Sequence, residues 1–283
     1  MVIPKPGKKS YSQPKSYWPI SLLSCFDKLL ETIIAKRLAH AAEMCGATHP
    51  SQMGAHWAEN SAVDVLLRTI NPIAKPISQK KASNNFPLRP AVLTHDMEGA
   101  FNQVHPATLR EVMLQWRMPL YLTNWVTAFN TDRKLAFGFD QHTEQPQPYE
   151  CGLPQGSPIS PILFLIYSNP MLEKQHHPSD TTDTSYVDDV CMVQMSPTVS
   201  RANTLLEERT DQHLQRGSHL GLTFDPPKTE LLYCLPLTSK DKNKSLASHP
   251  PSESETTPSW QHARLNTWEC SSTNHSASSI MPQ

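Results

Sequence analysis

The chain has 283 residues, of which 38% are hydrophobic, so it can bury a core and wholesale disorder is excluded. Its formal net charge of -1 argues, by bulk charge alone, against a protein that coats nucleic acid. No apolar run reaches the ~20 residues of a membrane span, and neither a secretory signal nor a C-x-x-C pair is present. We therefore expect an intracellular protein with reduced thiols and no membrane partner.

The first predicted element is a helix over residues 21–44, which Ser21 or Ser24 can cap. Residues 1–37 around its start hold seven Lys/Arg against two acidic residues, a local net charge of +5. Apolar residues recur at helical spacing along this segment, and we expect the whole stripe to face the core. The stripe consists of Leu22, Leu23, Phe26, Leu29, Leu30, Ile33, Ile34 and Leu38.

The middle of the chain alternates between helical and extended patterns. A second helix is predicted over 61–70, and residues 71–90, with four prolines, predict a loop. A short buried strand over 91–95 ends at Asp96. Pro106 and Pro119 each predict the start of a helix, where the missing N–H costs nothing. Residues 134–139 predict a strand, followed by a Gln/Pro-rich turn region.

The last part of the chain predicts a helix over 157–173 and a hairpin in which strands at 186–187 and 190–193 flank Asp188 and Asp189. A polar helix is expected over about 200–220 and a final strand over 229–235. Residues 236–283 are rich in serine and have no sustained period. We interpret this segment as a disordered or degenerate tail.

Three aspartates are placed where they could meet. Asp96 ends a buried strand, and Asp188 and Asp189 occupy a hairpin turn, so the three carboxylates converge if the strands adjoin in one sheet. Carboxylates suit Mg²⁺, a hard cation that leaves coordination positions open for phosphate oxygens. Two such ions would activate a primer 3′-hydroxyl and stabilise departing pyrophosphate. Taken alone, however, two adjacent aspartates in a turn are usually only a turn.

The blocks around these aspartates resemble, in order and spacing, the reverse transcriptase domain of non-LTR (LINE-type) retrotransposons. The resemblance covers about residues 1–235, and the combination of the last two palm blocks is the most specific part of it. The matching blocks are Ile3-Pro-Lys-Pro-Gly7, Tyr17-Trp-Pro-Ile-Ser-Leu-Leu23, Gln52-Met-Gly54 with Ser61-Ala-Val-Asp64, His95-Asp-Met-Glu-Gly-Ala-Phe-Asn102 (motif A), Cys151-Gly-Leu-Pro-Gln-Gly-Ser-Pro-Ile-Ser-Pro161 (motif B), Tyr186-Val-Asp-Asp189 (motif C) and Gly221-Leu-Thr-Phe224 with Lys228-Thr-Glu-Leu-Leu232 (motif D).

The resemblance implies an α+β fold, the fingers and palm of a right-hand polymerase, with an antiparallel palm sheet packed on helices. The implied domains are partial fingers over 1–90, the palm over 91–235 and the tail over 236–283. Since no thumb is expected after motif D, the sequence resembles a truncated or degenerate copy. The implied partners are an RNA template, a DNA primer or RNA–DNA hybrid, and dNTPs, with no obligate protein partner evident.

The resemblance also implies a role for individual residues. Asp96, Asp188 and Asp189 would be catalytic and hold two Mg²⁺ ions, for which Mn²⁺ can substitute. Lys228 would be the motif D lysine, a proton donor to pyrophosphate. The nucleotide-binding residues would be Lys5, which contacts the triphosphate, Phe101, a steric gate against a 2′-hydroxyl, and Gln155 and Gly156, which line the nucleotide pocket.

Departures from the family pattern leave other interpretations open. Trp18 stands where the family usually has an arginine that would clasp phosphate, and the usual basic residues after Gly54 are missing. The chain could therefore be an inactive remnant that at most binds RNA or RNA–DNA hybrid. An RNA-dependent RNA polymerase fits less well because of Phe101 and the Tyr186-Val187 pair, and an intron-type maturase is a further alternative. Family resemblance suggests a nuclear location, with a mitochondrial one as the alternative.

Overall fold

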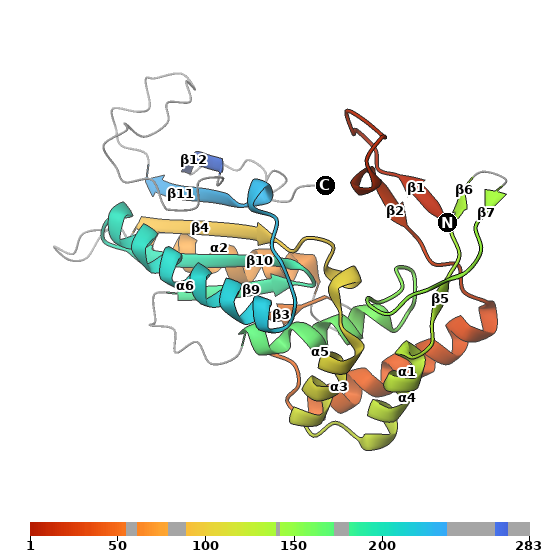
Figure 1. Cartoon of the computed structure of the whole chain (residues 1–283). Coiled ribbons are helices and arrows are strands. Elements are labelled where there is room, and N and C mark those ends of the chain that lie inside the picture. Colours follow the sequence, from red (N-terminus) through yellow and green to blue (C-terminus); the bar gives the residue numbers. More distant parts are fainter. Residues whose placement is uncertain (55–60, 79–88, 140–141, 173–180, 237–263, 271–283) are drawn as a thin grey trace.

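The computed structural model describes residues 1–54, 61–78, 89–139, 142–172, 181–236 and 264–270. Its largest element is a sheet, seen at the upper left of Figure 1, in which four central strands run antiparallel and the two outer strands join in parallel. The strand order is β12 (Arg264–Cys270), β11 (Glu230–Pro236), β4 (Arg89–Asp96), β10 (Asp189–Ser196), β9 (Thr181–Tyr186) and β3 (Gln52–Met53). The fold is therefore α+β.

Helices cover both faces of this sheet. Helix α6 (Val199–His219) lies on one face and α2 (Ala62–Ser78) on the other (Figure 1). Consecutive side chains of β4 point to opposite faces of the sheet, because side chains alternate along a strand. Leu93 belongs to the main hydrophobic core, whereas Val92 packs in a smaller cluster with Ile73 of α2.

A bundle of helices continues the main core at the lower right of Figure 1. It consists of α1 (Cys25–Met44), α3 (Pro106–Gln115), α4 (Leu120–Asn130) and α5 (Ser160–Leu172). Helix α5 is buried along almost its whole length, so its sequence is apolar all round rather than striped. Among the described residues, no helix is both long enough and apolar enough to cross a membrane.

Short two-stranded ladders lie beside the bundle. β1 (Val2–Pro4) pairs with β2 (Tyr17–Pro19), β5 (Lys134–Leu135) with β8 (Gln147–Pro148), and β6 (Gly138–Phe139) with β7 (His142–Thr143). Three 3₁₀ turns complete the described chain: η1 (Pro14–Ser16), η2 (Ala100–Gln103) and η3 (Pro226–Lys228).

Several sequence predictions are confirmed by the elements. Ser24 caps α1, since its side chain accepts a hydrogen bond from the Asp27 N–H at 3.1 Å. Pro106 is the first residue of α3, and Pro119 immediately precedes α4 as its cap residue. The predicted strands at 91–95 and 229–235 correspond to β4 and β11.

The predicted loop over 71–90 is wrong at both ends. Helix α2 runs through Pro72 and Pro76 to Ser78, and β4 already begins at Arg89; residues 79–88 lie outside the described chain. An interior proline costs a helix about 3 kcal/mol. Burial of Ile73 against the sheet favours continuing the helix across that cost.

The prediction that the whole apolar stripe of α1 faces the core is also wrong. Ile34 and Leu38 are buried, together with a row of alanines, but Phe26 is 85% exposed. Helix α1 packs against the rest of the protein on one side only. Its apolar surface is wider than that packed side, so part of the apolar surface is exposed to solvent. The exposed members of the stripe are Leu22, Phe26, Leu29, Leu30 and Ile33.

Two smaller corrections concern strands. The strand expected over 134–139 is two short ones, β5 and β6, and the Gln/Pro-rich region after it contains β7 and β8. In the segment predicted as a disordered or degenerate tail, residues 264–270 form β12, which pairs in parallel with β11. The rest of residues 237–283 lies outside the described chain.

Candidate active site

Three aspartates gather at one end of the sheet because two of its central strands are neighbours. Asp96 is the last residue of β4 and Asp189 the first of β10, and the two are direct partners in the antiparallel ladder. Asp188 lies in the two-residue turn that joins β9 to β10. The sequence placed Asp189 in the turn as well, but it pairs with Tyr186 and belongs to the strand.

The turn that carries Asp188 has an unusual backbone. Val187 has φ = 55°, a left-handed conformation that costs a branched side chain about 1–2 kcal/mol. Neighbouring strands hold it there: the Val187 N–H donates to the Met53 carbonyl at 3.1 Å, and the Ser185 hydroxyl donates to the Val187 carbonyl at 3.3 Å. Strand β3 therefore supports the turn from outside the hairpin.

The carboxylates repel one another. Burial, followed by the nearby charges of Asp189 and Asp96, raises the pKa of Asp188 to about 6. Burial and the charge of Asp96 also raise the pKa of Asp189, although Lys228 opposes the effect. This edge of the sheet thus concentrates negative charge that a cation would stabilise.

Lys228 supplies one cation to this edge. Its ammonium group donates to Asp96 Oδ2 and lies 3.4 Å from Asp225 Oδ2. Burial lowers the pKa of Lys228, but the hydrogen bond and charge of Asp96 outweigh it and the net shift is upward. Residues 223–228 are held beside β4, since the Asp225 N–H donates to the Asp96 carbonyl at 2.9 Å. Lys228 is therefore a protonated lysine fixed among carboxylates.

The N-terminal ladder reaches the same edge. Lys15, next to β2, forms an ion pair with Glu98, two residues after Asp96. Lys5 is held at the end of β1 by a 2.8 Å hydrogen bond from its N–H to the Ser16 carbonyl. Burial and the charges of Lys8 and Lys228 lower the pKa of Lys5, whereas Asp96 opposes the shift, so Lys5 lies within electrostatic reach of the carboxylates.

The remaining predicted residues form a second group. Phe101 lies in η2 with its ring 5.2 Å from that of Phe164, and its carbonyl accepts the Leu153 N–H at 2.7 Å. Gln155 and Gly156 follow shortly after Leu153. Gln155 lines a cavity of about 40 Å³, together with Asn102 and Arg133 among others. Phe101 and the motif B segment are thus joined directly.

Gly156 allows the N-terminal segment to approach this group. Its φ is +98°, and a Cβ there would come within 3.2 Å of the Ser21 carbonyl oxygen. The Ser21 N–H in turn donates to the Gln155 carbonyl at 2.7 Å. A side chain at position 156 would strain the backbone and press on this contact.

The three aspartate carboxylates suit a divalent cation chemically, but their side chains are not arranged as a complete set of metal ligands. Within the described ranges, no group of three or more His, Cys, Asp and Glu side chains is arranged to hold a metal ion. Three carboxylates at one sheet edge offer the oxygen ligands that Mg²⁺ prefers. One of them, Asp96, is bonded to Lys228 instead. The residues therefore fit a cation in chemistry, while one oxygen of Asp96, Oδ2, is engaged by Lys228.

Sequence reasoning missed some contributors to this edge. None of Asp225, Glu98 and Lys15 was assigned a role from the sequence. Glu98 lies within the motif A block and Asp225 lies three positions before Lys228, so their places beside these residues were an available signal. Lys15 is 83 positions from Glu98 along the chain and offered no such signal. The role of Gly54 beside the turn was also missed; its position in the Gln52-Met-Gly54 block was the available signal.

The chain is similar to known proteins over most of its length. The family model described as "Reverse transcriptase (RNA-dependent DNA polymerase)" matches residues 3–264. The chain is 28% identical over 196 residues to the "Probable RNA-directed DNA polymerase from transposon X-element" of Drosophila melanogaster, covering 69% of this chain and 20% of that protein. It is 26% identical to the "RNA-directed DNA polymerase from mobile element jockey" of the same species, covering 81% of this chain and 24% of that protein. It thus spans about a fifth to a quarter of the relatives it matches.

Solved structures agree on the fold. Telomerase from Candida tropicalis, solved with a fragment of telomeric RNA, superposes with a TM-score of 0.53 at 12% identity over 72% of this chain and 33% of that one. An apo telomerase from the same organism, truncated from its C-terminal domain, gives a TM-score of 0.51.

Proposed function

This chain belongs to the reverse transcriptase (RNA-dependent DNA polymerase) family, and on that premise we propose that it forms the fingers and palm of an RNA-directed DNA polymerase. It would add dNTPs to a primer 3′-hydroxyl on an RNA template. The observation that carries the proposal is the pairing of Asp96 with Asp189 across adjacent strands, with Asp188 in the turn beside them. The palm would be residues 91–235 and the fingers residues 1–90, although β3 is itself a strand of the central sheet and α2 packs on that sheet.

The cofactor would be Mg²⁺, bound as two ions by Asp96, Asp188 and Asp189, with Mn²⁺ able to replace it. When bound, the ions supply Lewis-acid stabilisation of the attacking and leaving oxygens. Lys228 would then leave Asp96, and as a protonated amine beside the site it would donate a proton to the departing pyrophosphate.

The second group of residues would form the nucleotide pocket. Phe101 would exclude a 2′-hydroxyl, since its ring is held against Phe164 and cannot easily move aside. Gln155 and Gly156 would line the pocket, and Lys5 would contact the triphosphate from the N-terminal ladder. The group is positioned for this by its backbone bonds to Phe101 and Ser21.

The expected macromolecular partner is an RNA–DNA hybrid, held through its phosphates without reading sequence. For a retrotransposon enzyme the expected place of action is nuclear DNA, with a mitochondrial element as the alternative.

Primer extension tests the proposed function. Purified chain is incubated with oligo(dT)-primed poly(rA), Mg²⁺ or Mn²⁺ and dTTP, beside the Asp188→Asn variant. We expect extension by the unmodified chain and at least a hundredfold less by the variant. Equal product from both would contradict the assignment of the site.

One observation favours a second function, binding of RNA or RNA–DNA hybrid without catalysis. Trp18 lies on β2 opposite Ile3, is 43% exposed, and cannot clasp a phosphate as an arginine would. If the chain is such a remnant, it should bind hybrid in a salt-dependent manner without extending the primer. The variant Trp18→Arg should then gain extension, and Trp18→Leu should not.

A further inference from the structure

Strand β9, which leads into the turn with Asp188, has a sequence that leaves its register undetermined. Its six residues, Thr181-Thr-Asp-Thr-Ser-Tyr186, include no aliphatic side chain. Register in a sheet is normally set by the alternation of apolar and polar residues, and strands that are polar on both faces are prone to slip. Something other than hydrophobic pattern must therefore hold β9 in place.

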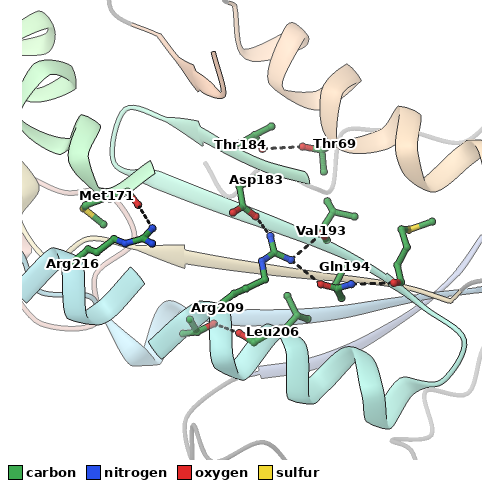
Figure 2. Close-up of polar contacts among 11 residues, drawn as sticks. Thr69, Met171, Asp183, Thr184, Val193, Gln194, Leu206, Arg209 and Arg216 are labelled. Atoms are coloured by element: carbon green, nitrogen blue, oxygen red, sulfur yellow. Dashed lines mark hydrogen bonds and ion pairs between the residues drawn. The ribbon is translucent and has the colours of Figure 1, made fainter. Parts of the chain in front are cut away.

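A single arginine contacts both strands of the hairpin from one face of the sheet (Figure 2). The Arg209 guanidinium, on α6, donates to the Asp183 carboxylate of β9, and the two side chains are only 10% and 5% exposed. The same guanidinium donates to the Val193 carbonyl at 3.2 Å and to Gln194 Oε1 at 3.1 Å, both on β10. Asp183 and Met192 are ladder partners, so the arginine bridges β9 and β10 where they pair.

The opposite face of β9 is held as well. Thr184, which follows Asp183 and points to the other face, is within 3.2 Å of the Thr69 hydroxyl of α2 (Figure 2). Cys191 is the direct ladder partner of Thr184, so the side chains of these two residues lie on the same face of the sheet. A slip by one residue would exchange these faces and separate Asp183 from Arg209 inside the protein.

We propose that Arg209 is a positioning residue that sets the register of the β9–β10 hairpin and thereby places Asp188 and Asp189. The ladder pair of Asp183 and Met192, where Arg209 binds, lies three pairs from Asp189, about 10 Å along the strand. It acts on the turn through the strands, because Asp189 faces Asp96 and Asp188 occupies the turn only when Tyr186 pairs with Asp189. The significance of this register rests on the proposed function, but the register itself does not.

Cysteine trapping reads the register without metal, nucleotide or activity. Native Cys191 is kept, and Cys25, Cys45, Cys151, Cys234 and Cys270 are replaced by serine or alanine. A partner cysteine is then introduced at Thr184 or, separately, at Ser185, and the protein is oxidised with diamide. The linked peptides are identified by mass spectrometry. Directly opposed residues on antiparallel strands have the Cα separation that a disulfide needs.

Two variants and one control distinguish a change in strand register from a general loss of stability. Arg209→Met breaks the ion pair, and the double variant Asp183→Leu with Arg209→Met replaces both charges with apolar side chains, a change that buried pairs often tolerate. The control is Arg216→Met, on the same helix, since Arg216 donates at 3.1 Å to the Met171 carbonyl of α5 rather than to the hairpin (Figure 2). Thermal melting reports whether each variant folds.

With Arg209 present, and in Arg216→Met, we expect crosslinking of Cys191 to position 184 and at least tenfold less to position 185. In both Arg209 variants the preference should fall at least fivefold, including in a double variant that melts within a few degrees of the parent. A folded double variant that keeps the full preference for position 184 would overturn the proposal. So would a parent chain that links Cys191 to position 185 as readily as to 184. Absence of primer extension with the 184 preference intact would instead count against the proposed function.

Discussion

Gly54 lies directly against Val187, the left-handed residue of the turn that carries Asp188. A Cβ added at Gly54 would stand 2.8 Å from Val187 Cγ2, and φ at Gly54 is +100°. The neighbouring Met53 carbonyl accepts the Val187 N–H, so contact and hydrogen bond act on the same turn. The close approach of β3 to the turn depends on the absence of a side chain at position 54.

Gly54→Ala should therefore lower the free energy of unfolding by about 2–4 kcal/mol, through the left-handed backbone and the clash together. Gly46→Ala is the matched control, because Gly46 also has positive φ but a Cβ there would meet nothing within 4 Å. Its cost should be only about 1–2 kcal/mol. Urea unfolding of both variants measures the difference, and equal costs would show that the contact with Val187 is unimportant.

Glu31 links α1 to the motif B segment, where it accepts a hydrogen bond from the Ser157 hydroxyl while only 4% exposed. Burial raises the pKa of Glu31, although the Ser157 bond opposes the shift. The folded chain then holds this proton more tightly than the unfolded chain, so the contribution of Glu31 to stability falls as pH rises from its ordinary pKa of 4.5 through the raised value.

Glu31→Gln removes that titration. The variant should gain stability relative to the parent between about pH 5 and about pH 8, as measured by urea unfolding at both pH values. The exposed Glu43→Gln should show no such trend. A parent whose stability relative to Glu31→Gln rises with pH would contradict the assigned direction.

Lys228 is predicted to act on the chemical step. Lys228→Gln removes the protonated amine beside Asp96, and the maximal rate of dTTP addition should fall about 10²-fold with a smaller change in KM. Lys15→Gln removes the same charge from an exposed ion pair with Glu98 and should change the rate less than threefold. Single-turnover extension measures both. A similar loss of rate in the two variants would mean that Lys228 contributes only its positive charge to the site and does not donate a proton.

Phe101 is predicted to select the sugar. Phe101→Val opens space beside the nucleotide, so the preference for dTTP over UTP, as a ratio of kcat/KM values, should fall at least tenfold, about 1.4 kcal/mol. Phe129→Val, which disturbs a partly buried ring stacked on Trp125, should leave the ratio unchanged. If Phe101→Val leaves the ratio of kcat/KM values for dTTP and UTP unchanged, Phe101 is not the residue that excludes the 2′-hydroxyl.

Local chemistry explains which elements were predictable. The Ser24 cap, the proline that opens α3 and the apolar run of β4 act within a few residues, so they can be read from the chain. Neighbouring strands around Asp96 and Asp188 were expected from the motif order, and the ladder places them together. The individual roles of Phe101, Gln155 and Lys5 stay predictions.

The rest depends on partners that are distant in sequence. Helix α2 passes through two prolines because Ile73 packs on the sheet. Five of the eight apolar stripe residues at α1 are exposed because only one layer covers that helix. The bond between Asp183 and Arg209 joins residues 26 positions apart, neither of which belongs to a recognised motif. Such contacts arise from packing geometry, which a periodic pattern does not encode.

The central claim is that Asp96, Asp188 and Asp189 act as one metal centre, and Mn²⁺ binding followed by electron paramagnetic resonance tests it most directly. The parent chain should bind Mn²⁺, and Asp96→Asn and Asp188→Asn should each weaken binding at least tenfold. Asp64→Asn, at the start of α2, should bind like the parent. Equal Mn²⁺ affinity in the parent and in both site variants would contradict the claim.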